Sequence, residues 1–187
     1  MELLIPKTEY IKYRINKGNL KRNKKLDRFI TWRTSIGRNL FDISEIDKRL
    51  RIAARFLSNR EVAVISTELD KEYAKIFCEF LNFTHIDHYT ASIFSNPQNK
   101  KFYEPDILFI TNVNQHRNVV EEANLNQIPV VAFCNTNSNV SGIDLIVPLN
   151  TISKKAIGIA LWLIANEVRK LRKEKEIILE NFIKVDE

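Results

Sequence analysis

Cationic and aromatic side chains alternate near the start of this 187-residue sequence. Lys and Arg recur from Arg14 to Arg38, with Tyr10 and Tyr13 just before them and Phe29 and Trp32 among them. Aromatic faces can stack on unpaired bases while cations neutralise phosphates, so the pattern predicts contact with folded or single-stranded RNA. The alternative interpretation is that the aromatic side chains pack on the core while the charges face water.

The charge distribution favours a polyanionic partner. Residues 1–41 contain eleven Lys/Arg and three Asp/Glu, whereas residues 42–187 contain eighteen and twenty, within a chain of net charge +6. Lys and Arg gain affinity for nucleic acid by displacing phosphate counterions. A second polar and basic stretch lies in the long segment 88–105. Loops of that length tend to be functional, so we expect this stretch to support RNA binding. The expected phosphate contacts are Arg14, Lys17, Lys21, Arg22, Lys24, Lys25, Arg28, Arg33 and Arg38, with Asn96, Lys100 and Lys101 in support.

Residues for other chemistries are sparse. The four glycines are far apart and form no phosphate-binding motif. His85 and His88 are three residues apart on or beside a predicted strand, so they should face opposite sides rather than hold one metal ion. Cys134 is expected to be a buried, inert thiol. The sequence therefore predicts no enzyme activity, no cofactor and no metal. One alternative remains, a small-molecule site in the polar loop Asn135–Asn139.

Apolar patterning predicts the elements that carry these residues. Short apolar runs at 61–66, 84–87, 106–111, 128–133 and 143–147 are typical of buried strands. Helical spacing separates them at 44–57, 70–82, 115–125 and 153–174. Strands alternating with helices indicate an α/β fold with a doubly wound sheet of about five parallel strands.

Finer features of two helices can also be predicted. Ser44 is expected to cap the first helix, with Asp47 satisfying free backbone donors in its first turn. The charged second half of the last helix, 169–175, is expected to project into solvent or onto a partner.

Composition indicates the compartment and excludes a membrane-spanning or secreted protein. Two cysteines, Cys78 and Cys134, favour a reducing compartment. The longest apolar run has ten residues, too short for a membrane span of ~20, and no signal-peptide pattern opens the chain. We expect a cytoplasmic protein with a basic segment at 1–43 packed on the body, an α/β domain at 44–175 and a tail at 176–187.

Several stretches resemble a known family. They are Arg28–Ile30 with Leu40–Ile43, Asp47–Leu57, Phe102–Leu108, Ile128–Ala132 followed by Asn135 and Thr136, and Ile143–Asn150. In this order and spacing they resemble the universal small-subunit ribosomal protein number two, in its archaeal or eukaryotic form (the laminin-receptor-precursor branch). The resemblance covers roughly residues 8–170.

The resemblance implies a flavodoxin-like domain without catalytic activity. Such a domain binds small-subunit rRNA between the head and body, beside neighbouring ribosomal proteins, and supports subunit assembly and translation. The chain looks like a compact, archaeal-type version. Two family glycines are replaced: the Gly-x-His-x-Gly pattern reads Arg14–Gly18, and the loop ending Gly-Thr-x-Thr-Asn-Pro reads Ala91–Pro97.

Overall fold

A five-stranded parallel sheet forms the centre of the molecule, as the apolar runs predict. In the computed structural model, which describes residues 3–182, the strand order is β4-β3-β5-β6-β7. With β3 counted as the first strand of the sheet, this is the flavodoxin-like order 2-1-3-4-5. The strands are β3 (Val62–Ile65), β4 (Thr84–Ile86), β5 (Ile107–Ile110), β6 (Val130–Cys134) and β7 (Leu145–Pro148).

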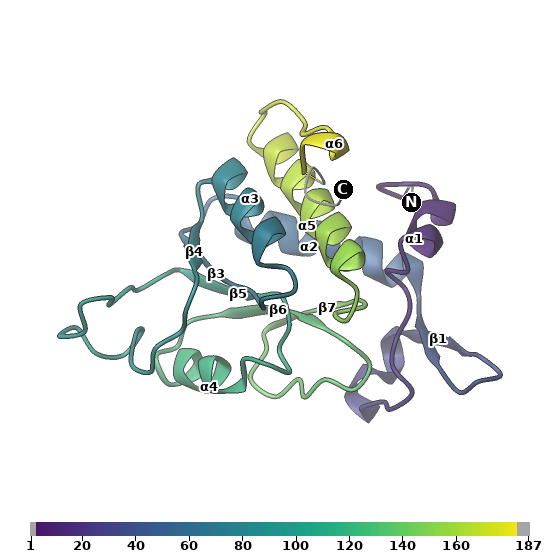
Figure 1. Cartoon of the computed structure of the whole chain (residues 1–187), viewed down its shortest axis with the longest axis horizontal. Helices are drawn as coiled ribbons and strands as arrows, with labels where there is room; N and C mark the ends of the chain where they lie inside the picture. The colour runs from purple at the N-terminus through teal and green to yellow at the C-terminus, as the bar shows by residue number, and fades with distance from the viewer. Residues whose placement is uncertain (1–2, 183–187) are drawn as a thin grey trace.

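Helices cover both faces of this sheet. In Figure 1, α2, α3 and α5 lie above the sheet, with α5 between the other two, and α4 lies below it. Because both faces are covered, every residue of β3, β5, β6 and β7 is buried. The helices are α2 (Ile43–Leu57), α3 (Lys71–Leu81), α4 (Arg117–Leu125) and α5 (Lys154–Leu171). The predicted fold class is confirmed.

The basic N-terminal segment forms a small layer beside the β7 edge. It contains α1 (Lys7–Lys12), a 3₁₀-helix η1 (Lys24–Phe29) and an antiparallel hairpin of β1 (Ile30–Arg33) and β2 (Asn39–Phe41). Figure 1 shows the hairpin projecting at one end of the long axis. The sequence analysis did not predict it, because two strands of four and three residues with an exposed face carry little hydrophobic pattern.

The predicted cap of α2 was wrong. The capping residue is Asp42, whose side chain accepts a hydrogen bond from the Ser44 N–H at 2.9 Å, and Ser44 already lies inside the helix. Asp47 does not satisfy backbone donors of the first turn. It is buried and faces the N-terminal segment, where it accepts from the Tyr10 hydroxyl and the Leu4 N–H.

The basic end of α5 follows the expectation in part, because Lys170, Lys173 and Lys175 are exposed while Arg172 is not. Arg172 turns towards the body and donates to the carbonyl oxygens of Ser58 and Leu81, at 2.6 and 2.9 Å. Those carbonyls belong to the C-terminal ends of α2 and α3, where helices leave acceptors unsatisfied and favour cations. The guanidinium therefore joins three helices instead of projecting into solvent.

The C-terminal segment then folds back on α5. The Ile177 carbonyl accepts from the Trp162 indole N–H at 2.8 Å, and Phe182 of α6 (Leu179–Phe182) is buried. The end of the predicted tail, 183–187, lies outside the described residues, as do 1–2 of the basic segment. Among residues 3–182, no helix combines the length and apolar character that crossing a bilayer requires.

Candidate RNA interface

Apolar anchors hold the N-terminal segment on the body. Tyr10, Ile15, Leu26 and Phe29 are each at most 1% exposed, so their burial fixes the backbone on both sides of the basic loop 16–25. Two of these four are aromatic residues of the basic stretch, which agrees with the packing interpretation. Trp32 does not follow the packing interpretation, because it is 68% exposed.

The Tyr10 anchor is joined to α2 by a buried polar group. Asp47 Oδ1 accepts from Tyr10 Oη at 2.9 Å and from the Leu4 N–H at 2.7 Å, while Oδ2 accepts from Arg51 Nε at 2.9 Å. Burial, followed by the neighbouring Asp47 charge, raises the pKa of Tyr10 far above its ordinary value. The phenol therefore remains a hydrogen-bond donor to Asp47.

A polar loop after β6 holds the backbone of the basic loop. The Thr136 hydroxyl accepts from the Asn19 N–H at 2.8 Å and donates to the Lys21 carbonyl at 3.0 Å. The Thr136 carbonyl accepts from the Asn23 N–H at 2.7 Å. Gly18 packs so closely that a Cβ there would overlap the Thr136 methyl group.

These contacts change the interpretation of the Asn135–Asn139 loop. Thr136 and Ser138 are fully buried beneath the N-terminal segment, and the Ser138 carbonyl accepts from Asn23 Nδ2 at 3.0 Å. Thr136 and the Ser138 carbonyl therefore hold part of this chain, whereas Asn137 and Asn139 are exposed.

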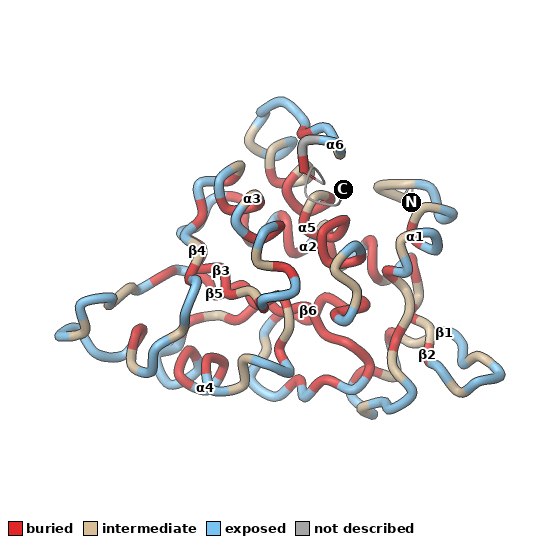
Figure 2. The backbone as a smooth tube through the Cα atoms, in the orientation of Figure 1, coloured by how far each residue is buried: buried red, intermediate tan, exposed pale blue. Residues whose placement is uncertain are grey.

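The cations of the basic segment face outward while their backbone is fixed. Lys17 is half-buried and its backbone bridges to Leu40. The exposed cations are Arg14, Lys21, Arg22, Lys24, Lys25, Arg28, Arg33 and Arg38. Figure 2 shows the basic loop and the hairpin tip as largely exposed stretches at the same end of the molecule. The exposed cations therefore belong to one segment whose backbone is held on the body.

Local contacts orient some of these cations. Arg22 lies 3.5 Å from Asp27, with both side chains largely exposed, so the pair is weak. The Arg28 guanidinium lies 4.7 Å from the centre of the Phe29 ring, and Arg33 Nε donates to the Gly37 carbonyl at 2.9 Å. These contacts limit where the side chains point without removing them from solvent.

The supporting residues of the second basic stretch lie elsewhere. Asn96, Lys100 and Lys101 are exposed in the loop 88–105, at the end of the long axis opposite the β1–β2 hairpin (Figure 1). The structure therefore does not bring the two predicted groups together on one surface. A single RNA partner would have to extend along the molecule to reach both.

A buried carboxylate fixes the base of the loop 88–105. Glu122 of α4 accepts from the Tyr89 hydroxyl, from the N–H groups of Ser92 and Phe94 at 3.1 and 2.9 Å, and from the Ser95 hydroxyl at 3.1 Å. Burial opposes ionisation, but these donors outweigh it and lower the pKa of Glu122. Nothing in the sequence pairs Glu122 with a loop some thirty residues away, so the role went unpredicted.

We expect Glu122→Gln to loosen this loop. The donors favour the ionised carboxylate, so its contribution is present above the ordinary pKa of 4.5 and is lost as the pH falls through the lowered folded-state pKa. The variant should cost about 1.5–3 kcal/mol near neutral pH, should flatten the acid limb of the stability curve, and should speed hydrogen exchange at the Ser92 and Phe94 amides. Urea denaturation against pH and exchange mass spectrometry measure these effects.

The matched control is Glu121→Gln, which changes an exposed carboxylate paired with Arg117 on the same helix. It should change the free energy of unfolding by no more than about 0.5 kcal/mol and leave hydrogen exchange at the Ser92 and Phe94 amides unchanged. Equal effects for the two variants would contradict the proposed role of Glu122.

The two replaced family glycines coincide with unusual backbone geometry. Arg14 has φ 58° and Ser92 has φ 67°, both in the left-handed region that glycine adopts most easily. Anchored neighbours hold each of them there: the Ile15 N–H donates to the Tyr10 carbonyl at 3.0 Å, and the Ser92 N–H donates to Glu122. Both residues therefore adopt a conformation typical of glycine without being glycine.

Ser66, His85 and Asp87 form a hydrogen-bonded chain that the sequence analysis missed. Ser66 Oγ lies 2.9 Å from His85 Nε2, and His85 Nδ1 lies 3.2 Å from Asp87 Oδ1. Burial lowers the pKa of His85 against the opposing effect of Asp87. A serine nucleophile also needs amide donors for an oxyanion, but the next amide, that of Thr67, already donates to Asp70. The contacts tie the end of β3 to β4.

Both cysteines are free and buried, which disfavours the thiolate form. Burial, and secondarily Glu79, raises the pKa of Cys78 to about 12, and complete burial raises the pKa of Cys134 further. Thiols with raised pKa values are poor nucleophiles. Across residues 3–182 no group of three or more His, Cys, Asp or Glu could hold a metal ion.

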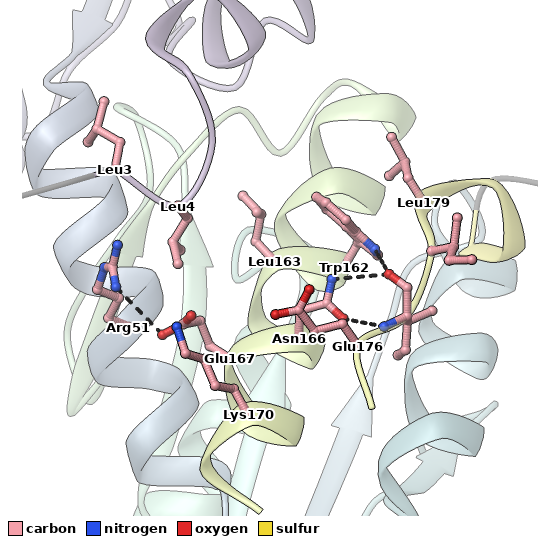
Figure 3. A pocket seen from close by; sticks show the side chains of 12 residues that line it. Leu3, Leu4, Arg51, Trp162, Leu163, Asn166, Glu167, Lys170, Glu176 and Leu179 are labelled. Atoms are coloured by element: carbon pink, nitrogen blue, oxygen red, sulfur yellow. Dashed lines mark hydrogen bonds and ion pairs between the residues drawn. The ribbon is translucent and has the colours of Figure 1, made fainter. Parts of the chain in front are cut away.

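A cavity of about 730 Å³ lies between the N-terminal segment, α2, α5 and the C-terminal segment (Figure 3). Its polar side chains bond to one another: Arg51 lies 3.8 Å from Glu167, and Asn166 exchanges hydrogen bonds with the Ile177 backbone. These contacts join the N-terminal and C-terminal segments to the body. Among the lining residues we find no arrangement typical of a catalytic site.

Fold and surface together define a class: a flavodoxin-like α/β protein that carries a rigid, basic N-terminal appendage. Comparison with known proteins then identifies the family within this class. The ribosomal protein S2 family model matches residues 78–170. The chain is 32% identical to small ribosomal subunit protein uS2 of Ignicoccus hospitalis over 174 residues, covering 90% of this chain and 82% of that protein. It is 30% identical to uS2 of Thermofilum pendens, covering 91% and 82% respectively.

The chain therefore belongs to the ribosomal protein S2 (uS2) family, and the resemblance found in the sequence is confirmed. These relatives are archaeal, which matches the archaeal-type features of the sequence. The family is one of ribosomal proteins rather than enzymes.

Proposed function

We propose that this protein is a structural component of the small ribosomal subunit that binds rRNA through its basic N-terminal segment. Residues 1–43 act as the binding segment and residues 44–175 as the body that holds it. The partners are small-subunit rRNA and the neighbouring ribosomal proteins. The protein acts between the head and body and supports assembly of the subunit.

One observation carries this proposal: eight exposed cations project from a backbone that buried anchors and Thr136 hold in place. A fixed array of cations recognises the shape of a folded phosphate backbone, and it loses less conformational entropy on binding than a flexible arm does. Contacts of this kind depend on RNA shape more than on base sequence.

The proposal is tested by cosedimentation of the purified protein with small subunits that lack this component, at low and high salt. We expect stable association at low salt and a steep loss as the salt concentration rises, because bound cations release counterions from the phosphates. Failure to sediment with the subunits at any salt concentration would refute the proposed function.

A further inference from the structure

A groove of about 230 Å³ separates α1, the β1–β2 hairpin and the start of α2. Its polar lining is Lys7, Asn16, Thr31, Asp42 and Ser44, and the remaining lining residues are apolar or aromatic, Trp32 among them. The groove lies on the basic segment and borders the cavity of Figure 3 at Leu3, which lines both. Its size is that of one flat aromatic ring system rather than of a folded ligand.

Trp32 gives this groove an aromatic wall. The indole is 68% exposed on β1, and Ile11 beside the groove is 50% exposed. A large aromatic side chain left in water gains free energy when another flat surface covers it. Among residues 3–182, neighbouring side chains leave most of the indole uncovered, so the ring is available for stacking.

Asn16 adds an unsatisfied polar group. It lines the groove, and within residues 3–182 its Oδ1 atom is buried and accepts no hydrogen bond. A buried acceptor without a donor is costly. Because this atom is closed to solvent, the Asn16 side chain must rotate before a ligand N–H can reach it, and the new hydrogen bond would then remove that penalty. Nucleobases present such groups on their edges when they are unpaired.

Charge selects among possible occupants. Lys7 lines the groove. Arg33 is exposed at the end of β1, and Arg38 is exposed in the turn between β1 and β2. The carboxylate of Asp42 also lines the groove, but it caps α2 by accepting from the Ser44 N–H. Cations around an aromatic wall suit a base with its phosphate better than an apolar peptide.

We propose that this groove binds one unpaired RNA base, stacked on Trp32 and hydrogen-bonded through Asn16, with its phosphate near Lys7. The inference rests on the proposed function and specifies how the segment recognises RNA. It predicts a preference for single-stranded or bulged nucleotides, whereas the cations alone accept any folded phosphate backbone.

Fluorescence gives a direct test, because the chain has only two tryptophans. In a Trp162→Phe background, Trp32 is the sole indole, and its emission should be quenched by an unstructured 12-nucleotide RNA. The same RNA annealed to its complement, and inorganic polyphosphate, should quench it little. These two probes retain the charge but offer no free base.

Affinity for the unstructured RNA is measured in the otherwise unchanged chain. Trp32→Ala should weaken binding roughly 5- to 150-fold without altering the salt dependence, and Trp32→Phe should retain most of the affinity. Asn16→Ala should also weaken binding, by roughly 3- to 30-fold. The control is Phe56→Ala, which removes another partly exposed aromatic ring on α2 and should have no effect.

Other outcomes overturn the inference in distinguishable ways. Unchanged affinity in Trp32→Ala with steep salt dependence would remove the base site and leave the proposed function standing. Equal quenching by duplex or polyphosphate would rule out stacking. Loss of a neighbouring protein from subunits containing Trp32→Ala, with RNA affinity unchanged, would identify the groove as a protein contact. Absence of RNA binding by every variant and by the unmodified chain would refute both proposals.

Discussion

Replacing Lys21, Arg22, Lys24 and Lys25 together with serine is expected to abolish stable association with small-subunit rRNA at physiological salt. All four side chains are exposed on a backbone that Thr136 and Asn23 hold in place. Each lost phosphate contact should reduce the slope of log affinity against log salt by roughly 0.7–0.9, and so by about 3 in total. Filter binding across a salt series measures both quantities.

A charge-matched variant separates local contacts from net charge. Replacing Arg55, Arg60, Lys173 and Lys175 with serine removes the same charge from exposed positions near the ends of α2 and α5. The salt slope should remain close to that of the unmodified protein. If the two variants lose affinity equally, the basic segment is not the contact surface and only overall charge matters.

The second large effect is expected from Asp47→Ala. This change removes the acceptor for the Tyr10 hydroxyl, the Leu4 N–H and Arg51, and leaves these groups without their buried partner. We expect the free energy of unfolding to fall by about 3–5 kcal/mol, as for other broken buried pairs. Urea denaturation gives the value, and hydrogen exchange should show increased opening of residues 3–33.

Glu45→Ala is the control for Asp47→Ala, since it removes a partly exposed carboxylate of α2 that pairs with Lys48. It should change the free energy of unfolding by no more than about 0.5 kcal/mol. A similarly small effect of Asp47→Ala would mean that the apolar anchors alone hold the N-terminal segment.

The sequence predicts the sheet well because burial on both faces produces continuous apolar runs. Ile107–Ile110 and Val130–Cys134 are apolar and fully buried, and their short length and β-branched residues favour strands over buried helix segments. The helices follow from apolar residues at helical spacing, which requires only local information.

The features that fix the candidate interface depend on long-range pairs instead. Thr136 bonds to residues more than 110 positions earlier, and Asp47 bonds to Tyr10 across 37 positions. The residues next to Thr136 or Asp47 in the sequence do not indicate which distant residue it bonds to. For the same reason the sequence suggested a ligand loop at Asn135–Asn139, where the structure has a support for the basic segment.

The charged end of α5 shows a similar limit. A run of Arg and Lys usually lies in solvent, but Arg172 reaches the free carbonyls at the ends of two neighbouring helices. Only the packing of α2 and α3 against α5 creates that environment.

Ultraviolet cross-linking of the protein within assembled small subunits tests the central claim most directly. Mass spectrometry of the cross-linked peptides would identify which part of the chain lies against rRNA. Our account predicts that cross-links concentrate at residues 14–38, with Trp32 among the modified positions. Cross-links confined to α3, α5 or the C-terminal segment, with none in residues 14–38, would contradict it.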